Sequence, residues 1–91
     1  MPAWQIKFEK NAVKDLKKLP PTIHKRIGVK LKWFIDQADP ISFATLLVGN
    51  GLIGEYRYRV GSYRILFDAN KQTKTIIVRV VMHRREVYKN R

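Results

Sequence analysis

The sequence predicts an α+β fold in which a small antiparallel sheet carries a helical hairpin on one face. Three observations predict it: a hairpin pattern around Gly61-Ser62, a β-branched run after it, and two segments with apolar residues at helical spacing before it. Helices and strands that occupy separate stretches of a chain pack as two layers. Ninety-one residues suffice for one modest core, so we expect a single domain over residues 1–91.

The first elements predicted are a strand and two helices. Residues 3–8 alternate large apolar and polar side chains, as in a strand covered on one face. Residues 10–19 predict a helix with Asn11 as its N-cap, ended by two prolines. A second helix follows over about residues 21–37. Gly28 weakens it by about 1 kcal/mol relative to alanine, and we expect this glycine to allow close packing against the first helix.

Residues 41–54 are the hardest part of the sequence to interpret. Phe43, Leu46, Leu47 and Val48 are apolar, and no lysine or arginine occurs between Asp36 and Tyr56. One interpretation is a loop that packs against the edge of the core. The other is an exposed apolar surface for a protein partner.

Residues 55–67 predict the hairpin around which the chain is organised. A glycine at the first central position of its two-residue turn suits a type II′ turn, which needs a positive φ there. The resulting register places Arg59 opposite Arg64, with Arg57 on the same face. Like charges across a strand pair are destabilising by roughly 0.2–1 kcal/mol. The arginines therefore form either a solvated, splayed face or a face that binds an anion such as a phosphate backbone.

Residues 73–82 form a β-branched run that predicts a central strand. Simple alternation puts Arg79 on one face with Thr75, Ile77, Val81 and His83. The tail His-Arg-Arg-Glu-Val-Tyr, residues 83–88, follows directly.

The net charge of +12 and the pI of about 10.4 restrict the class of partner. They indicate nucleic acid, ribonucleoprotein, an anionic membrane surface or an acidic protein. Without cysteine, disulfides and thiolate chemistry are excluded. No apolar run is long enough to span a membrane, and the start lacks the apolar region of a signal peptide. We expect a cytoplasmic protein with no membrane contact.

The remaining chemistry is basic and aromatic. Two histidines and seven scattered carboxylates predict no metal site, and nothing in the sequence indicates a cofactor. Arginine clamps phosphate and stabilises charge on a pentavalent phosphorus, tyrosine relays protons, and histidine titrates near neutrality. A site of these groups would cleave RNA through its 2′-hydroxyl without metal: Arg57, Arg59, Arg64, His83, Arg84, Arg85 and Tyr88.

Each of these tail residues also has a structural interpretation. Glu86 is either a carboxylate partner in the site or the acidic half of an ion pair with a nearby arginine. The Arg84-Arg85 pair is alternatively a basic tail that adds only electrostatic attraction. Tyr88 is alternatively an aromatic side chain packed at the sheet edge.

Residues 56–67, Tyr-Arg-Tyr-Arg-Val-Gly-Ser-Tyr-Arg-Ile-Leu-Phe, together with residues 83–88, resemble the RelE branch of the RelE/ParE toxin superfamily. The resemblance extends to the amino-terminal strand, the Leu-Lys-Lys-Leu-Pro segment and the helical hairpin. The two late motifs are fairly specific together and weak alone. Unlike many relatives, the chain has no basic residue in residues 46–54.

The resemblance implies a toxin of a type II toxin–antitoxin system that enters the ribosomal A site and cleaves translated mRNA. It matches Arg64 to a transition-state clamp and Tyr88 to a tyrosine that stacks on or activates the substrate. The implied catalytic residues are Arg64, Arg85, Tyr88 and His83, and the implied RNA-binding residues are Arg57, Arg59, Arg84 and Lys89. The implied partners are the ribosome, mRNA and a RelB-like antitoxin with an acidic segment, in a toxin–antitoxin hetero-oligomer.

Two other functions stay open at this point. A ParE-like toxin would share the fold, lack ribonuclease activity and act on DNA gyrase. A plain RNA-binding module would use the arginine face without cutting anything. The Glu-Val-Tyr ending favours the RelE-type function, in which the tyrosine has a catalytic use.

Overall fold

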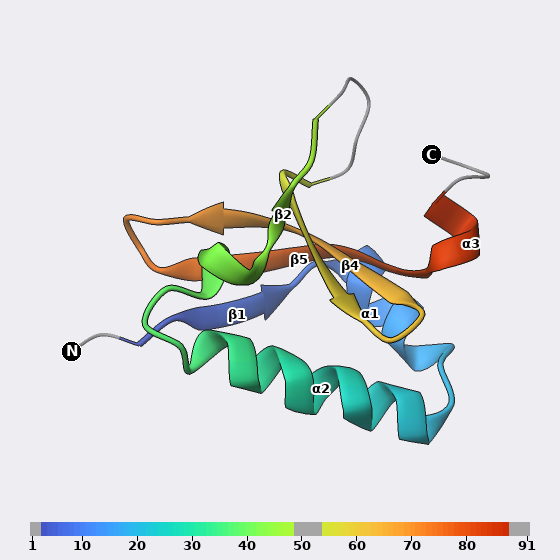
Figure 1. The fold of residues 1–91 in the computed structure, drawn as a ribbon. Helices are drawn as coiled ribbons and strands as arrows, with labels where there is room; N and C mark the ends of the chain where they lie inside the picture. The colour runs from blue at the N-terminus through green and yellow to red at the C-terminus, as the bar shows by residue number, and fades with distance from the viewer. Residues whose placement is uncertain (1–2, 49–53, 88–91) are drawn as a thin grey trace.

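The computed structural model describes residues 3–48 and 54–87 (Figure 1). The elements in chain order are β1 (Gln5–Phe8), α1 (Lys10–Lys17), α2 (Pro21–Ile35), the 3₁₀ helix η1 (Pro40–Phe43), β2 (Thr45–Leu46), β3 (Tyr56–Val60), β4 (Tyr63–Asn70), β5 (Thr75–His83) and α3 (Arg84–Val87). The predicted α+β fold is confirmed, with α1 and α2 packed on one face of the sheet. No helix in the described ranges is long and apolar enough to cross a membrane.

The sheet has the order β1-β5-β4-β3-β2 and is mixed rather than antiparallel. β2 to β5 pair antiparallel, but β1 runs parallel to β5, with Gln5 opposite Thr75. The backbone N–H of Gln5 donates to the Lys74 carbonyl at 2.8 Å, and that of Glu9 donates to the Val78 carbonyl at 2.9 Å. The expected antiparallel orientation of β1 was therefore wrong. The reason is that alternation of apolar residues predicts which face a strand buries but not the direction in which the strand runs.

The main core lies between the helical hairpin and the sheet. Its centre is Tyr58 of β3, which is 1% exposed and stacks on Phe34 of α2 with ring centroids 3.8 Å apart. Phe67 of β4 stacks on the other side of the tyrosine at 4.4 Å. The remaining buried members come from both layers: Ala12, Leu16, Ile27, Leu31, Ile41, Val60, Ile65, Ile76, Val78 and Val81.

The helices differ from their predicted limits at the ends. α1 begins at Lys10 with Glu9 in the N-cap position, so Asn11 lies inside the first turn and is not the cap. α2 ends at Ile35, two residues before the predicted end. A Cβ at Gly28 would meet no atom within 4 Å outside its own helix and chain neighbours. The expectation that Gly28 allows close helix packing was therefore wrong.

The segment before β3 combines both interpretations of residues 41–54. Pro40 and Ile41 are buried in the edge of the core, as expected of a packed loop. Phe43, Leu46 and Val48 are instead exposed. The short strand β2 was not predicted, because two residues are too few to show alternation. Residues 49–53 lie outside the described residues.

A bulge in β5 changes the face of the residues after it. Leu66 pairs with Val80 while Phe67 pairs with Val78, so Arg79 is the extra residue. Val81 consequently lies in the main core, and His83, opposite Tyr63, lies on the same side. The prediction that these two residues share a face with Ile77 was therefore wrong. The Arg79 guanidinium pairs with Asp68 at 2.7 Å and with Glu9 at the start of α1.

Candidate functional site

The hairpin of β3 and β4 has the predicted register. Gly61 has a φ of +58°, as the first central position of a type II′ turn requires. Arg59 pairs directly with Arg64, and Arg57 pairs with Leu66. These three arginines therefore occupy the sheet face opposite the main core, whose hairpin members are Tyr58, Val60, Ile65 and Phe67. We call them the arginine face.

A small apolar cluster lies beside the arginine face, and the sequence pattern did not predict it. Leu66, Val80 and Met82 are buried there, and Leu47 packs against them. The pairing of Arg57 with Leu66 and of Arg64 with Met82 places the arginines beside this cluster. The hairpin register was the available signal, since it predicts Leu66 on this face.

The arginines differ in exposure and in partners. Arg59 is exposed, whereas Arg57 and Arg64 are half-buried. The Arg57 Nε is buried and has no hydrogen-bond partner within residues 3–48 and 54–87, and neither Arg57 nor Arg59 has an ion pair there. Arg64 Nη1 donates to the carbonyls of Tyr63, at 3.2 Å, and Gly61, at 3.4 Å. The positive charges of Arg57 and Arg59 are therefore not neutralised by an ion pair within the described residues.

The carboxy-terminal segment is tied to the same hairpin. The Arg84 backbone N–H donates to the Ser62 carbonyl at 2.7 Å, which holds the start of α3 at the turn. His83 Nδ1 accepts the Arg85 backbone N–H at 3.3 Å. Glu86 accepts the His83 backbone N–H at 3.4 Å, and no arginine pairs with it within the described residues.

The predicted site residues are only partly brought together. His83 pairs with Tyr63, and the two rings meet edge to face at 5.3 Å. Tyr63 packs against the main core, so the register puts His83 on the helix side and Arg64 on the other. Arg84 and Arg85 are exposed in α3. Tyr88 and Lys89 lie outside the described residues.

This geometry fits an anion and offers no metal site in the described part. Residues 3–48 and 54–87 contain no group of three or more histidines and carboxylates that would hold a metal ion. Three guanidinium groups on one face suit a phosphate, because each group donates to two oxygens at once.

Comparison with known proteins assigns the chain to a family. The family model for the ParE toxin of type II toxin–antitoxin systems matches residues 6–88. The chain belongs to the RelE/ParE toxin superfamily. Toxin RelE3 of Methanocaldococcus jannaschii is 36% identical over 86 residues, which cover 92% of this chain and 94% of that protein.

Solved structures of RelE toxins share the fold. The RelBE2 toxin–antitoxin complex of Mycobacterium tuberculosis matches with a TM-score of 0.75 and 28% identity, covering 91% of this chain and 93% of that chain. The RelB–RelE antitoxin–toxin complex of Methanococcus jannaschii matches with a TM-score of 0.65 and 35% identity, covering 90% and 94%. As a superfamily member, the chain is a toxin of a toxin–antitoxin system with a RelE-like structure.

Proposed function

We propose that this toxin is a ribosome-dependent endoribonuclease that cleaves translated mRNA in the A site, in the cytoplasm. The observation that carries the proposal is the arginine face, where Arg59 and Arg64 are direct cross-strand neighbours beside Arg57. Like charges placed directly opposite each other are destabilising, and a bound anion would offset this repulsion. The Arg57 Nε, buried without a partner in the described residues, would donate to a phosphate oxygen.

The reaction needs charge stabilisation and two proton transfers. The ribose 2′-oxygen attacks the adjacent phosphorus, the bond from phosphorus to the 5′-oxygen breaks, and the proton lost by the 2′-hydroxyl is balanced by one gained at the 5′-oxygen. Arg64 stabilises the negative charge of the pentavalent state. The proton transfers fall to the carboxy-terminal segment, where we propose Tyr88 as the group that relays the proton. Arg85 stays protonated and adds charge stabilisation, whereas His83 lies on the helix side of the sheet and takes no part in this step. Arg57, Arg59, Arg84 and Lys89 hold the RNA backbone.

The proposed protein partner is a RelB-like antitoxin with an acidic segment. Two of the structural relatives, from M. tuberculosis and M. jannaschii, are complexes of a toxin with its antitoxin. A charge of +12 on 91 residues favours fast association with an acidic chain. The antitoxin would neutralise the toxin in a hetero-oligomer.

The test is primer extension on a programmed ribosome complex with purified variants. Arg64→Ala is expected to reduce mRNA cleavage by roughly a hundredfold or more, the effect of losing one preorganised charge donor. The matched control is Lys14→Ala, which removes a basic side chain from the exposed surface of α1. It is expected to cleave like the parent.

Two results would contradict the proposal in different ways. A folded Arg64→Ala variant that cleaves as fast as the parent would make Arg64 a structural residue. A parent that leaves ribosome-bound mRNA intact but inhibits DNA gyrase would have the ParE-like function. The match to a ParE family model is the observation that favours this second candidate.

A further inference from the structure

A groove between α2 and the end of β3 adjoins the arginine face at Arg59. Its volume is about 730 Å³, and its lining combines three apolar side chains, Val29, Trp33 and Val60, with a basic rim of Lys25, Arg26, Lys30 and Arg59. Val29 is 63% exposed and Trp33 43% exposed, both high for large apolar side chains. An apolar floor with a rim of one charge sign is a feature of binding sites.

We propose that this groove, which we call the α2 groove, binds an acidic amphipathic segment of the antitoxin. The inference rests on the proposed function, because the occupant is the antitoxin proposed there. Apolar side chains of the segment would cover Val29 and Trp33, and its carboxylates would face Lys25, Arg26 and Lys30.

The spacing of the lining residues sets the length of the occupant. Thr22, Arg26, Val29 and Trp33 recur every three or four residues along one side of α2. At 1.5 Å per residue they extend over about 16 Å, or three helical turns. A helical occupant of about three turns, with its own apolar residues at the same spacing, matches this surface.

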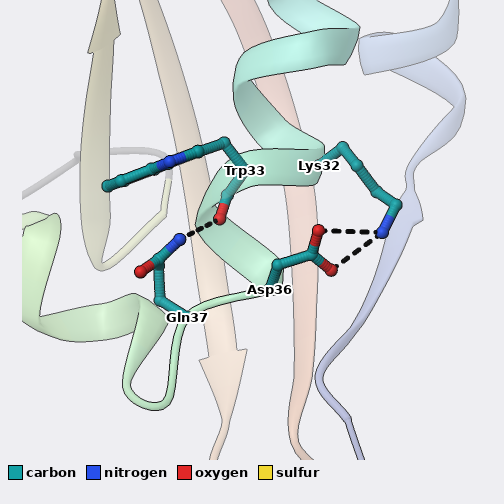
Figure 2. Close-up of polar contacts among 4 residues, drawn as sticks. All are labelled: Lys32, Trp33, Asp36 and Gln37. Carbon is teal, nitrogen blue, oxygen red and sulfur yellow. Dashed lines mark hydrogen bonds and ion pairs between the residues drawn. The ribbon is translucent and has the colours of Figure 1, made fainter.

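The basic side chains of the groove rim are free of ion pairs within the described residues, whereas Lys32 at the end of the same helix is paired with Asp36. Figure 2 shows the Lys32 ammonium paired with the Asp36 carboxylate on one side of α2, while the Trp33 ring extends to the other side. None of the four basic rim residues has an ion pair within residues 3–48 and 54–87. Carboxylates of a partner would therefore add ion pairs without breaking any within residues 3–48 and 54–87.

The surroundings of Trp33 favour a peptide over RNA. Single-stranded RNA binds proteins largely by stacking bases on the faces of aromatic rings. The Lys30 ammonium lies over the Trp33 ring, 4.6 Å from its centroid, and Phe43 meets the same ring edge to face at 5.1 Å. With a cation over the ring, aliphatic contact suits the groove better than base stacking.

The groove is continuous with the arginine face through Arg59. Arg59 belongs to both surfaces, because β3 pairs with β2 only at Tyr56 and Arg57 and is an edge strand beyond them. The Arg26 guanidinium lies within 3.2 Å of the position that a Cβ on Gly61 would occupy. A segment in the groove would engage Arg59 and so remove one of the proposed RNA contacts.

The test uses the proposed antitoxin, sought as a short acidic protein encoded next to this chain's gene and purified in complex with the toxin. The variant is Lys25→Glu/Lys30→Glu, and the control is Lys14→Glu/Lys71→Glu, which makes the same change in charge at exposed positions away from the groove. We expect the groove variant to raise the Kd for the antitoxin by ten- to a hundredfold at low salt, and by less at high salt. The control is expected to bind within a few-fold of the parent.

Val29→Glu tests the apolar floor separately. The substitution places a carboxylate where we expect apolar contact with the antitoxin, and it should raise the Kd about tenfold or more. Because Val29 is exposed on α2, the fold tolerates the change. Equal binding by parent, groove variants and control overturns the groove proposal and leaves the proposed function standing. Groove variants that keep antitoxin affinity but lose co-sedimentation with ribosomes overturn it in favour of an RNA surface. A parent that binds no neighbouring protein yet cleaves mRNA overturns both the antitoxin and this proposal.

Discussion

Tyr58 connects the sheet to the turn after α2. Its hydroxyl donates to the Pro40 carbonyl at 2.6 Å inside the core, and its ring is stacked between Phe34 and Phe67. Burial raises the pKa of the Tyr58 hydroxyl well above its ordinary value, and the nearby Asp39 carboxylate raises this pKa further. The sequence shows a tyrosine on the core face of a strand, but not which carbonyl it binds.

Tyr58→Phe is expected to lower the free energy of unfolding by about 1–3 kcal/mol, because it leaves the buried Pro40 carbonyl without its donor. Urea unfolding followed by circular dichroism measures the change. Tyr56→Phe, a half-buried tyrosine of the same strand, is the control and should change stability less. Equal stability of Tyr58→Phe and the parent would mean that this hydrogen bond contributes nothing net.

The same variant changes the pH dependence of stability. Because the pKa of Tyr58 is raised in the folded state, the unfolded chain loses the tyrosine proton first, from about pH 10 upward. The stabilisation is complete below that pH and is lost as the pH rises through the folded pKa. The stability difference between the parent and Tyr58→Phe should therefore shrink as the pH is raised from about 8 to about 11.

At the scale of elements, two glycines have opposite roles. Gly54, just before β3, has a φ of +88°, and a Cβ there would lie 2.9 Å from the Phe67 backbone nitrogen, beside the bulge. Gly28, in the middle of α2, has space for a Cβ. The contrast separates a glycine that the backbone requires from one that it merely tolerates.

We expect Gly54→Ala to destabilise the protein by about 2 kcal/mol or more, because strain and a backbone clash add. Gly28→Ala should stabilise it by about 0.5–1 kcal/mol, since alanine suits a helix interior better than glycine. Urea titrations of the two variants against the parent give both values. A destabilised Gly28→Ala variant would show that a neighbouring side chain packs against Gly28.

The elements also show what the sequence could and could not predict. The hairpin register was predictable, because Gly61-Ser62 fixes the pairing of Arg59 with Arg64. The parallel pairing of β1 was not, because it depends on how the helical hairpin returns the chain to the sheet. The bulge at Arg79 was not either, since alternation assumes that no residue is inserted.

At the scale of the whole molecule, positive charge is present on both layers. The arginine face lies on the open side of the sheet, and the basic rim of the α2 groove lies along α2. Composition predicted an anionic partner, but only the three-dimensional arrangement separates two basic surfaces of different character. Beside the arginine face the apolar side chains, such as Leu66 and Met82, are buried. In the α2 groove the apolar side chains of Val29 and Trp33 are exposed.

Salt dependence distinguishes these surfaces in RNA binding. Each phosphate contact to a single strand contributes roughly 0.7 to the slope of log K against log salt. Arg57→Ala and Arg59→Ala should each lower that slope by about this amount, measured by fluorescence anisotropy with a short labelled RNA. Lys25→Ala, a residue of the groove rim, should leave the slope within error of the parent, because the groove is proposed to hold a peptide. A slope lowered equally by all three variants would mean that RNA covers both surfaces, and would remove the distinction between the arginine face and the α2 groove.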